Sequence, residues 1–326
     1  MNEKILTISI AAYNVEKYLE ATLESITLEP EVMQQLEVII EDDGSTDGTT
    51  EIAKRYSMKY PNSIILNSEK NGGYGATINR SIRIAKGKYF KQLDGDDWFD
   101  NNNLSKFIVY LKEIDADFVL TPYRECYENG KIIDIDHFHQ IKSEVGGVEQ
   151  LNRNVNLAMH ELTIRTDLLK NNRISITENC FYTDNEYTML PFLYAKTVSK
   201  FDFPIYCYRL GRNGQSVSIA GVKKHYKDSV IVTTKLLNYF FNTAGVKMNE
   251  IIEHKINLLT DMVYTYHIVA GSEEARQGLL QFDRMLRENY PTVYKQSYHI
   301  TKVKALRLSH FSLFNYIRRK VLRTWT

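Results

Sequence analysis

Strand-like and helix-like segments alternate along the first hundred residues of this chain of 326 residues. Four short runs rich in β-branched or aromatic residues are candidate strands, and they lie at residues 5–12, 37–40, 64–66 and 89–93. Segments with apolar residues at helical spacing separate these runs. Such alternation is typical of a parallel sheet covered by helices on both faces. The sequence therefore predicts an α/β fold with a mixed, mostly parallel sheet.

Polar segments follow the predicted strands, at residues 11–14, 42–49, 71–75 and 94–97. In open α/β sheets, ligands bind outside the carboxyl ends of the strands. Because all four polar segments are expected at that edge, the sequence predicts one ligand site built from four loops.

An acidic cluster follows the fourth predicted strand and consists of Asp94, Asp96 and Asp97. Carboxylates this close repel one another unless a positive charge offsets them. Mg²⁺ is typically held between one or two carboxylates and substrate phosphates. A plain acidic turn is the alternative, since Asp and Gly are common turn residues. The convergence of the loops favours a metal-bridged phosphate site.

Composition narrows the class of protein further. The formal net charge is +1, so no overall electrostatic field favours a nucleic-acid partner. The three cysteines form no Cys-x-x-Cys pair, which argues against a disulfide framework and a zinc site. No apolar run approaches the roughly 20 residues of a membrane-spanning helix, and residues 1–4 lead into the first predicted strand without a signal-peptide core. We therefore expect a cytoplasmic protein.

The regular alternation ends near residue 98, and helical patterns dominate from residue 225 to residue 290. A chain of this length is expected to hold a main domain with additions. We predict a main domain over residues 1–220 and a C-terminal helical region over residues 221–326.

The motifs and their order resemble glycosyltransferase family 2. They are, in chain order, Ile-Ser-Ile-Ala-Ala-Tyr-Asn at residues 8–14, Glu-Asp-Asp-Gly-Ser-Thr-Asp-Gly-Thr at 41–49, Asn79 with Ala-Lys-Gly-Lys-Tyr at 85–89, Leu-Asp-Gly-Asp-Asp-Trp at 93–98 and, more weakly, Thr-Asp at 183–184 and Tyr-Arg at 208–209 with Ser216 and Ser218. The resemblance covers the first two thirds of the chain. It implies a GT-A fold, which is a Rossmann-like nucleotide-binding architecture, as the catalytic domain.

The resemblance also implies a function. It implies a hexosyltransferase that moves a sugar from a nucleotide-diphosphate donor, expected to be UDP-linked, to a hydroxyl of a saccharide acceptor. The implied reaction is a direct displacement that inverts the anomeric centre and depends on Mn²⁺ or Mg²⁺. The acceptor would be a lipid-linked glycan or a glycoprotein glycan in bacterial capsule, exopolysaccharide or glycoprotein assembly.

The resemblance assigns the nucleotide to the first two loops. Tyr13 would stack on the base, with Ala11 beside it. Asp43 would pair with the edge of the base, and Asp42 is the alternative. The glycine-rich segment around Gly73 precedes a helix, so its backbone N–H groups are expected to approach a phosphate or ribose. A flexible turn is the other interpretation of that segment.

The acidic cluster would hold the cation and the ribose. One carboxylate among Asp94, Asp96 and Asp97 would bind the metal and another the ribose hydroxyls; Asp96 is the favoured metal ligand and Asp97 the alternative. Arg209 and Ser216 resemble a loop that closes over the diphosphate, where Arg clamps phosphate well.

The general base would be Asp184, because Thr183-Asp184 matches the Glu-Asp pair of the family. The chain departs from that pattern at Thr183, and the nearby Glu186 keeps a second assignment open. An acid at a helix N-terminus is the structural alternative for Asp184. His160 and Glu161 fall where related chains line the acceptor cleft.

The last segment, residues 291–326, contains no acidic residue and interleaves basic with apolar side chains. A basic amphipathic helix suits an anionic membrane surface, which would make the protein peripheral at the inner face of the cell membrane and bring it to a lipid-linked acceptor. Docking on the catalytic domain or contact with another subunit of an oligomer is the alternative.

Two other functions are compatible with parts of this sequence. A sugar nucleotidyltransferase also combines a parallel sheet, a metal and a nucleotide, but a glycine-rich basic loop is expected after its first strand, and residues 11–14 lack it. A non-catalytic scaffold subunit that binds a partner enzyme through the basic tail is the other alternative.

Overall fold

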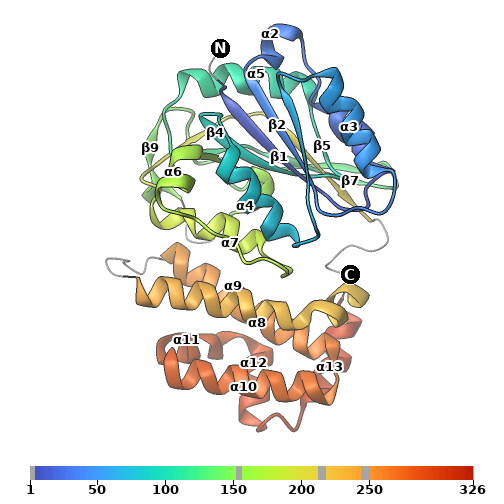
Figure 1. Cartoon of the computed structure of the whole chain (residues 1–326). Coiled ribbons are helices and arrows are strands. Elements are labelled where there is room, and N and C mark those ends of the chain that lie inside the picture. Colours follow the sequence, from blue (N-terminus) through green and yellow to red (C-terminus); the bar gives the residue numbers. More distant parts are fainter. Residues whose placement is uncertain (1–3, 152–155, 212–217, 244–249, 326) are drawn as a thin grey trace. The chain divides into compact units, whose positions relative to one another are not determined.

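The computed structural model of the protein describes residues 4–151, 156–211, 218–243 and 250–325. The chain forms two compact units, Met1–Arg212 and Asn213–Thr326, and each is described by itself (Figure 1). The division expected from the sequence, at residues 220 and 221, stays a prediction.

The N-terminal unit is built on an eight-stranded sheet with the order β3-β2-β1-β4-β10-β6-β11-β9. Its strands are β1 (Leu6–Ala12), β2 (Leu36–Asp42), β3 (Ile64–Ser68), β4 (Tyr89–Asp94), β6 (Phe118–Leu120), β9 (Gly146–Gly147), β10 (Leu162–Arg165) and β11 (Thr197–Lys200). The first four strands along the chain pair in parallel, whereas β10 is antiparallel to both β4 and β6. The predicted mixed, mostly parallel sheet is therefore confirmed.

The helices of this unit cover the sheet and fill the crossovers between strands. They are α1 (Leu19–Ser25), α2 (Pro30–Met33), α3 (Thr49–Lys59), α4 (Tyr74–Ile84), α5 (Asn101–Glu113), α6 (Thr166–Asn171) and α7 (Asp184–Met189), with short 3-10 turns η1 (Val148–Gln150), η2 (Met159–Glu161) and η3 (Pro191–Leu193). Helix α4 packs on β1 and β2, and α3 packs on β2 and β3. All residues of β2 are buried, and successive strand residues point to opposite faces, so both faces of this strand are covered.

A second, four-stranded sheet lies in the same unit, with the order β5-β12-β7-β8. Its strands are β5 (Trp98–Phe99), β7 (Tyr123–Tyr127), β8 (Ile132–Ile135) and β12 (Tyr206–Leu210). Cys207 of β12 pairs with Trp98 of β5. This pairing brings β12 next to the loop that holds the acidic cluster, because β5 begins directly after Asp97.

The C-terminal unit is helical, as the sequence predicts. Its helices are α8 (Ile219–Asn242), α9 (Glu250–Ala270), α10 (Glu273–Asn289), α11 (Pro291–Gln296), α12 (Thr301–Leu308) and α13 (Phe314–Arg323), with a 3-10 turn η4 (Ser297–His299). The side chain of Ser218 caps α8 by accepting from the N–H of Gly221, and Ser272 caps α10 in the same way.

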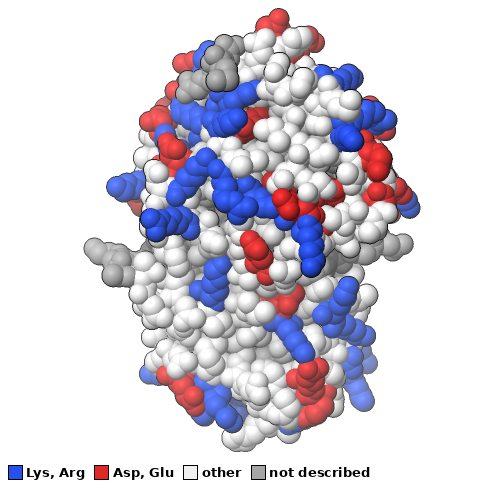
Figure 2. All heavy atoms as spheres, viewed as in Figure 1, with Lys and Arg blue, Asp and Glu red and all other residues white. Residues whose placement is uncertain are grey.

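The basic tail differs from the single amphipathic helix that its sequence suggested. It forms three short helices, because its apolar side chains are buried in the core of this unit; these are Val293, Val303, Leu306, Phe314 and Ile317. Arg307 is itself buried and donates to Asp283 over 2.6 Å. Acidic and basic side chains lie beside one another on the face drawn in Figure 2. Among the described residues, no helix has both the length and the apolar character needed to cross a membrane.

Candidate active site

The strand register brings the polar loops to one edge of the large sheet. Ala11, near the end of β1, lies opposite Glu41 of β2 on one side and opposite Asp94 of β4 on the other. Because all three strands run in the same direction, the loops that follow them begin side by side. The N–H of Gly95 also donates to the Ala11 carbonyl over 3.0 Å, which joins the first loop to the acidic one.

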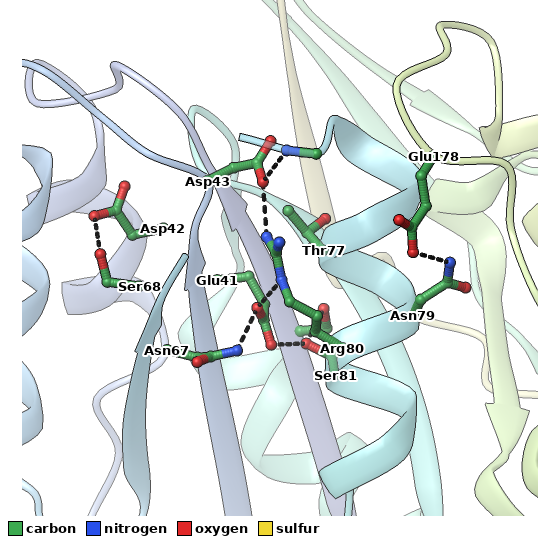
Figure 3. A network of polar contacts seen from close by, with 12 residues as sticks. Glu41, Asp42, Asp43, Asn67, Ser68, Thr77, Asn79, Arg80, Ser81 and Glu178 are labelled. Atoms are coloured by element: carbon green, nitrogen blue, oxygen red, sulfur yellow. Dashed lines mark hydrogen bonds and ion pairs between the residues drawn. The ribbon is translucent and has the colours of Figure 1, made fainter. Parts of the chain in front are cut away.

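Asp43 connects the second loop to the glycine-rich segment (Figure 3). Its carboxylate accepts hydrogen bonds from the N–H of Gly72 at 3.0 Å and from the N–H of Gly73 at 2.8 Å. Arg80 of α4 adds an ion pair of 2.7 Å to the same carboxylate. The Gly73 N–H, which the sequence assigned to a phosphate or ribose, is therefore engaged with Asp43 instead. Gly73 has a φ of +79°, which favours glycine.

Arg80 is shared between two acids. Its Nε donates to Glu41 Oε2 over 2.8 Å while its Nη2 reaches Asp43, and Figure 3 shows the guanidinium between them. The Glu41 side chain is completely buried, and burial raises its pKa against the opposing effect of Arg80. Sequence reasoning missed Arg80 because its partners lie 37 and 39 residues earlier in the chain.

Asp42 has a different set of partners, which belong to its own loop and to β3. It accepts from the N–H of Ser45 at 3.0 Å, from Thr50 Oγ1 at 2.5 Å and from Ser68 Oγ at 3.0 Å. Burial alone would raise the pKa of Asp42, but these hydrogen bonds outweigh it and lower the pKa. Asp42 thus organises the strand end, whereas Asp43 faces the glycine-rich segment.

Tyr13 is exposed on the first loop, with 52% of its surface accessible. The next residue, Asn14, fixes that loop to the second one: its N–H donates to Ser45 Oγ over 3.0 Å, and its side-chain oxygen accepts from the N–H of Thr46 over 2.8 Å. An exposed aromatic ring on a fixed loop offers a flat surface on which a base could stack.

The acidic cluster is held by two tyrosines. Tyr74, at the start of α4, donates to Asp94 Oδ1 over 2.7 Å, and Tyr206 of β12 donates to Asp97 Oδ2 over 2.6 Å. The other oxygen of Asp97 accepts from the N–H of Arg209 over 2.8 Å. Burial, followed by the charges of Asp94 and Asp96, raises the pKa of Asp97 well above its usual range. A divalent cation would relieve this repulsion.

A histidine completes a group of candidate metal ligands. Ligand atoms of Asp94, Asp97 and His160 all lie within 4.8 Å of one another. Oxygen and nitrogen donors at this separation suit a divalent transition ion, so the residues present fit the metal that the family resemblance implies. Asp96, the favoured ligand from the sequence, is not part of this group. Burial, and then the charge of Lys91, lowers the pKa of His160 to about 3, so its imidazole is neutral.

Lys91 was not singled out from the sequence and is completely buried on β4. Its Nζ donates to the carbonyl of His160 over 2.9 Å and to that of Leu162 over 3.3 Å. Burial lowers the pKa of Lys91 to about 7. The Lys91 side chain thus fixes the backbone that carries His160.

Arg209 was predicted to clamp a diphosphate and lies directly beside the acidic cluster. Its Nε donates to the Asp96 carbonyl over 2.9 Å, and its guanidinium lies over the rings of Trp98, at 4.7 Å, and Tyr18, at 5.0 Å. Ser216, assigned to the same closing loop, lies outside the described residues.

The two candidates for the general base differ sharply in exposure. Asp184 is exposed at the start of α7. Its charge adds to the effects of burial and of Asp94 that raise the pKa of Tyr74, so it lies within electrostatic range of the acidic cluster. Glu186 is completely buried and accepts from the N–H of Thr177 at 2.7 Å and from its Oγ1 at 2.8 Å. The structure therefore leaves Asp184 as the accessible carboxylate.

Glu161, predicted to line an acceptor cleft, is buried and accepts from His137 Nδ1 over 2.9 Å. Its hydrogen bond raises the pKa of His137. Glu161 is thus a structural partner of His137, and its neighbour His160 is the residue that reaches the acidic cluster.

Comparison with known proteins gives a family match over half of the chain. The family model described as glycosyl transferase family 2 matches residues 7–172. The poly(ribitol-phosphate) beta-glucosyltransferase of Bacillus spizizenii is 29% identical over 219 residues, which cover 67% of this chain and 34% of that protein. The poly(ribitol-phosphate) beta-N-acetylglucosaminyltransferase TarS of Staphylococcus aureus is 26% identical over 71% of this chain and 40% of its own length. The chain thus spans well under half the length of these two relatives.

Solved structures share the fold. A crystal structure of S. aureus TarS residues 1–349 in complex with UDP-GlcNAc has a TM-score of 0.70 at 20% identity, covering 97% of this chain and 92% of that one. The mannosyltransferase PcManGT from Pyrobaculum calidifontis, in complex with GDP-Man and Mn²⁺, has a TM-score of 0.54 at 14% identity, covering 94% of this chain and 88% of its own.

Proposed function

The chain belongs to glycosyl transferase family 2 and has the GT-A fold, and from that premise we propose that it transfers a sugar from a UDP-linked donor to a hydroxyl of a saccharide acceptor. The family match and the names of the relatives support this activity. The single observation that carries the proposal is the convergence of Tyr13, Asp43 and the acidic cluster on one edge of the sheet.

The nucleotide would bind at the first two loops. Tyr13 would stack on the uracil, and Asp43 would accept from the base N–H with the lone pair that its three protein donors leave on Oδ2. The UDP-GlcNAc complex of TarS, which shares the fold, supports a uridine nucleotide as part of the donor.

The diphosphate would lie over the acidic cluster. Asp94, Asp97 and His160 would hold a divalent cation, with Asp96 at the rim, and the cation would offset the charge of the leaving diphosphate. The Mn²⁺ in the fold neighbour PcManGT supports such an ion. Arg209, whose Nε donates to the Asp96 carbonyl, would reach the same phosphates.

Asp184 would act as the general base. It would take the proton of the acceptor hydroxyl while that oxygen forms a bond to C1 of the donor sugar. The bond between C1 and the diphosphate oxygen breaks as the new bond forms, so the configuration at C1 inverts and UDP leaves. The exposure of Asp184 and its electrostatic reach to Tyr74 support this role.

The acceptor would be a hydroxyl-bearing polymer, and the names of two relatives, which act on poly(ribitol-phosphate), support this class. A lipid-linked glycan or a glycoprotein glycan, which the family resemblance implies, is the other candidate. The C-terminal unit would bring the enzyme to an anionic membrane surface through α13 and the residue before it, where Tyr316 and Leu313 are exposed at 53% and 44%. Arg319 and Arg323 are exposed on the same helix.

A nucleotide-release screen tests the proposed donor class. The full chain is incubated with Mn²⁺ and a panel of UDP-, GDP- and dTDP-sugars, and the released nucleoside diphosphate is measured. UDP should be released from a UDP-sugar by the wild-type chain and not by Asp184→Asn. Release of GDP or dTDP alone would refute the uridine assignment.

A further inference from the structure

We propose that His160 is a direct protein ligand of the cation at the donor site and that it makes this site prefer Mn²⁺ over Mg²⁺. The inference rests on the proposed function for the presence of a cation, and it goes beyond that function in assigning a nitrogen ligand and a metal preference. The motif that marks the acidic cluster contains no such residue.

The topology of the sheet places His160 at the acidic cluster. Strand β10 runs antiparallel to β4, with Ile164 opposite Phe90. Residues that precede β10 therefore approach the carboxyl end of β4, where Asp94 lies. His160 is in η2, two residues before β10 begins at Leu162. A chain segment that is distant in sequence thus delivers an imidazole to the ligand site.

The separations suit coordination. One ligand atom from each of Asp94, Asp97 and His160 lies within 4.8 Å of the other two. With bonds of about 2.1 Å to a small divalent ion, opposite ligands are about 4.2 Å apart. The observed separations are therefore close to those of ligands that share one cation.

The imidazole is oriented by packing. Its ring stacks on Tyr208, with centroids 4.3 Å apart, and meets the edge of Tyr206 at 4.7 Å. The Nζ of Lys91 donates a hydrogen bond to the His160 carbonyl and so fixes the backbone of the same residue. Among the residues that the structure describes, no hydrogen bond is made by the His160 imidazole, so its nitrogens are not committed to another protein group. An imidazole ring that is held in place and has a nitrogen without a protein partner is suited to bind a metal ion.

The donor set predicts the metal preference. Mg²⁺ is bound almost entirely by oxygen and loses its waters reluctantly, whereas first-row transition ions accept imidazole nitrogen readily. Replacing one oxygen ligand by a nitrogen ligand therefore weakens the binding of Mg²⁺ more than the binding of Mn²⁺. A site formed by aspartates alone would lack this discrimination.

Pulsed EPR of bound Mn²⁺ tests the nitrogen ligand directly. The full chain is loaded with Mn²⁺ and UDP, and electron spin echo envelope modulation is recorded. We expect ¹⁴N modulation that changes to the ¹⁵N pattern when the protein is made with ¹⁵N-labelled histidine. Absence of histidine nitrogen coupling in the wild-type chain would overturn the inference, and this measurement does not depend on any variant folding.

Two variants identify the histidine. The coupling should disappear in His160→Ala and persist in His139→Ala, a matched control with an exposed imidazole in the same unit. Coupling that survives in His160→Ala would also overturn the inference.

Calorimetric titration separates this inference from the proposed function. His160→Ala should lower the affinity for Mn²⁺ in the presence of UDP by at least about tenfold, with a smaller change for Mg²⁺. Mn²⁺ that binds the wild-type chain without nitrogen coupling refutes only the His160 assignment. If Mn²⁺ does not bind the wild-type chain with UDP, both the inference and the metal dependence in the proposed function fail.

Discussion

The phenol of Tyr206 donates a hydrogen bond of 2.6 Å to Asp97 Oδ2, between residues 109 positions apart in the sequence. Both side chains are buried. Burial leaves the Asp97 carboxylate without water, so this phenol and the N–H of Arg209 replace the missing solvation. The second sheet thereby fixes the acidic loop of the first.

Removing that phenol should destabilise the N-terminal unit. In Tyr206→Phe, the buried Asp97 Oδ2 loses its hydrogen-bond donor, and the free energy of unfolding should fall by about 2 kcal/mol. Urea unfolding followed by circular dichroism measures the change. Tyr208→Phe keeps the ring that stacks on His160 and serves as the control, with an expected change below about 0.5 kcal/mol. Equal losses in the two variants would contradict the role given to the Tyr206 hydroxyl.

Arg80 should contribute far more to the free energy of unfolding than an exposed arginine does. Arg80→Met leaves Glu41 and Asp43 buried without a counter-charge, which should cost on the order of 3–5 kcal/mol. Arg80→Lys should recover little, because a single ammonium cannot reproduce the planar fork of hydrogen bonds. Chemical denaturation provides the measurement.

The matched control for Arg80 is Arg55→Met, since Arg55 forms an ion pair with Glu20 whose side chains are 58% and 52% exposed. That change should cost less than about 1 kcal/mol. A similar cost for both arginines would show that the network in Figure 3 contributes no more than a surface pair.

Asp184→Asn should separate binding from catalysis. Loss of the general base should reduce turnover by about 10²- to 10⁴-fold, while the affinity for UDP measured by calorimetry stays within about twofold. Glu186→Gln is the informative comparison, because Glu186 bonds to Thr177 inside the protein and its substitution should lower stability rather than turnover at saturating donor. A variant of Asp184 with wild-type turnover would remove it from the mechanism.

Lys91 should give the protein a pH-dependent stability. Its pKa is lowered to about 7 in the folded chain, so between about pH 7 and 10 the unfolded chain binds more protons than the folded one, and stability rises with pH. The contribution should be up to about 1.4 kcal/mol per pH unit in that window. It is lost as the pH falls through the folded pKa, where the buried amine must take up a proton.

The measurement compares unfolding free energies of the wild-type chain and Lys91→Met at pH 7.5 and 9. The difference between them should change in favour of the wild type at the higher pH, whereas Lys54→Met, an exposed substitution, should show no such trend. A parallel pH dependence in wild type and Lys91→Met would contradict the buried, neutral lysine.

The exposed apolar residues at the start of α13 should govern attachment to anionic lipid. Replacing Leu313 and Tyr316 together by Glu should reduce co-sedimentation with phosphatidylglycerol vesicles by at least about tenfold, because it removes apolar contact and adds negative charge. Phosphatidylcholine vesicles should bind neither protein. Met58→Glu, at a residue 73% exposed in the N-terminal unit, is the control. Unchanged partitioning of the double variant would exclude α13 as the membrane contact.

The sequence predicted the half of the sheet whose signals are local. The run at residues 5–12 reads as a strand by itself, and Asp94 follows the next predicted strand end directly, so the parallel core and its polar edge could be expected. The partners of the acidic cluster could not. Tyr206 and His160 reach Asp97 and Asp94 only because β12 pairs with β5 and β10 runs antiparallel to β4, and short strands leave no periodic signal of their pairing.

For the C-terminal tail, a clear local pattern led to a wrong expectation. Residues 291–326 read as one amphipathic helix because basic and apolar side chains alternate at helical spacing. The pattern could not reveal that Arg307 is buried against Asp283 and the ring of Tyr294, which lies 3.7 Å from its guanidinium. A basic residue enclosed by aromatic and acidic side chains belongs to a core, and α12, which carries Arg307, ends one residue later at Leu308.

The hydrogen bonds that join Asp43 to Gly72, Gly73 and Arg80 tie the second loop to the glycine-rich segment and to α4. A base that bound beside this carboxylate would meet a loop whose dihedral angles are fixed by contacts within the protein, so little conformational entropy would be lost on association. Recognition at this end of the donor is therefore expected to be preorganised by the fold.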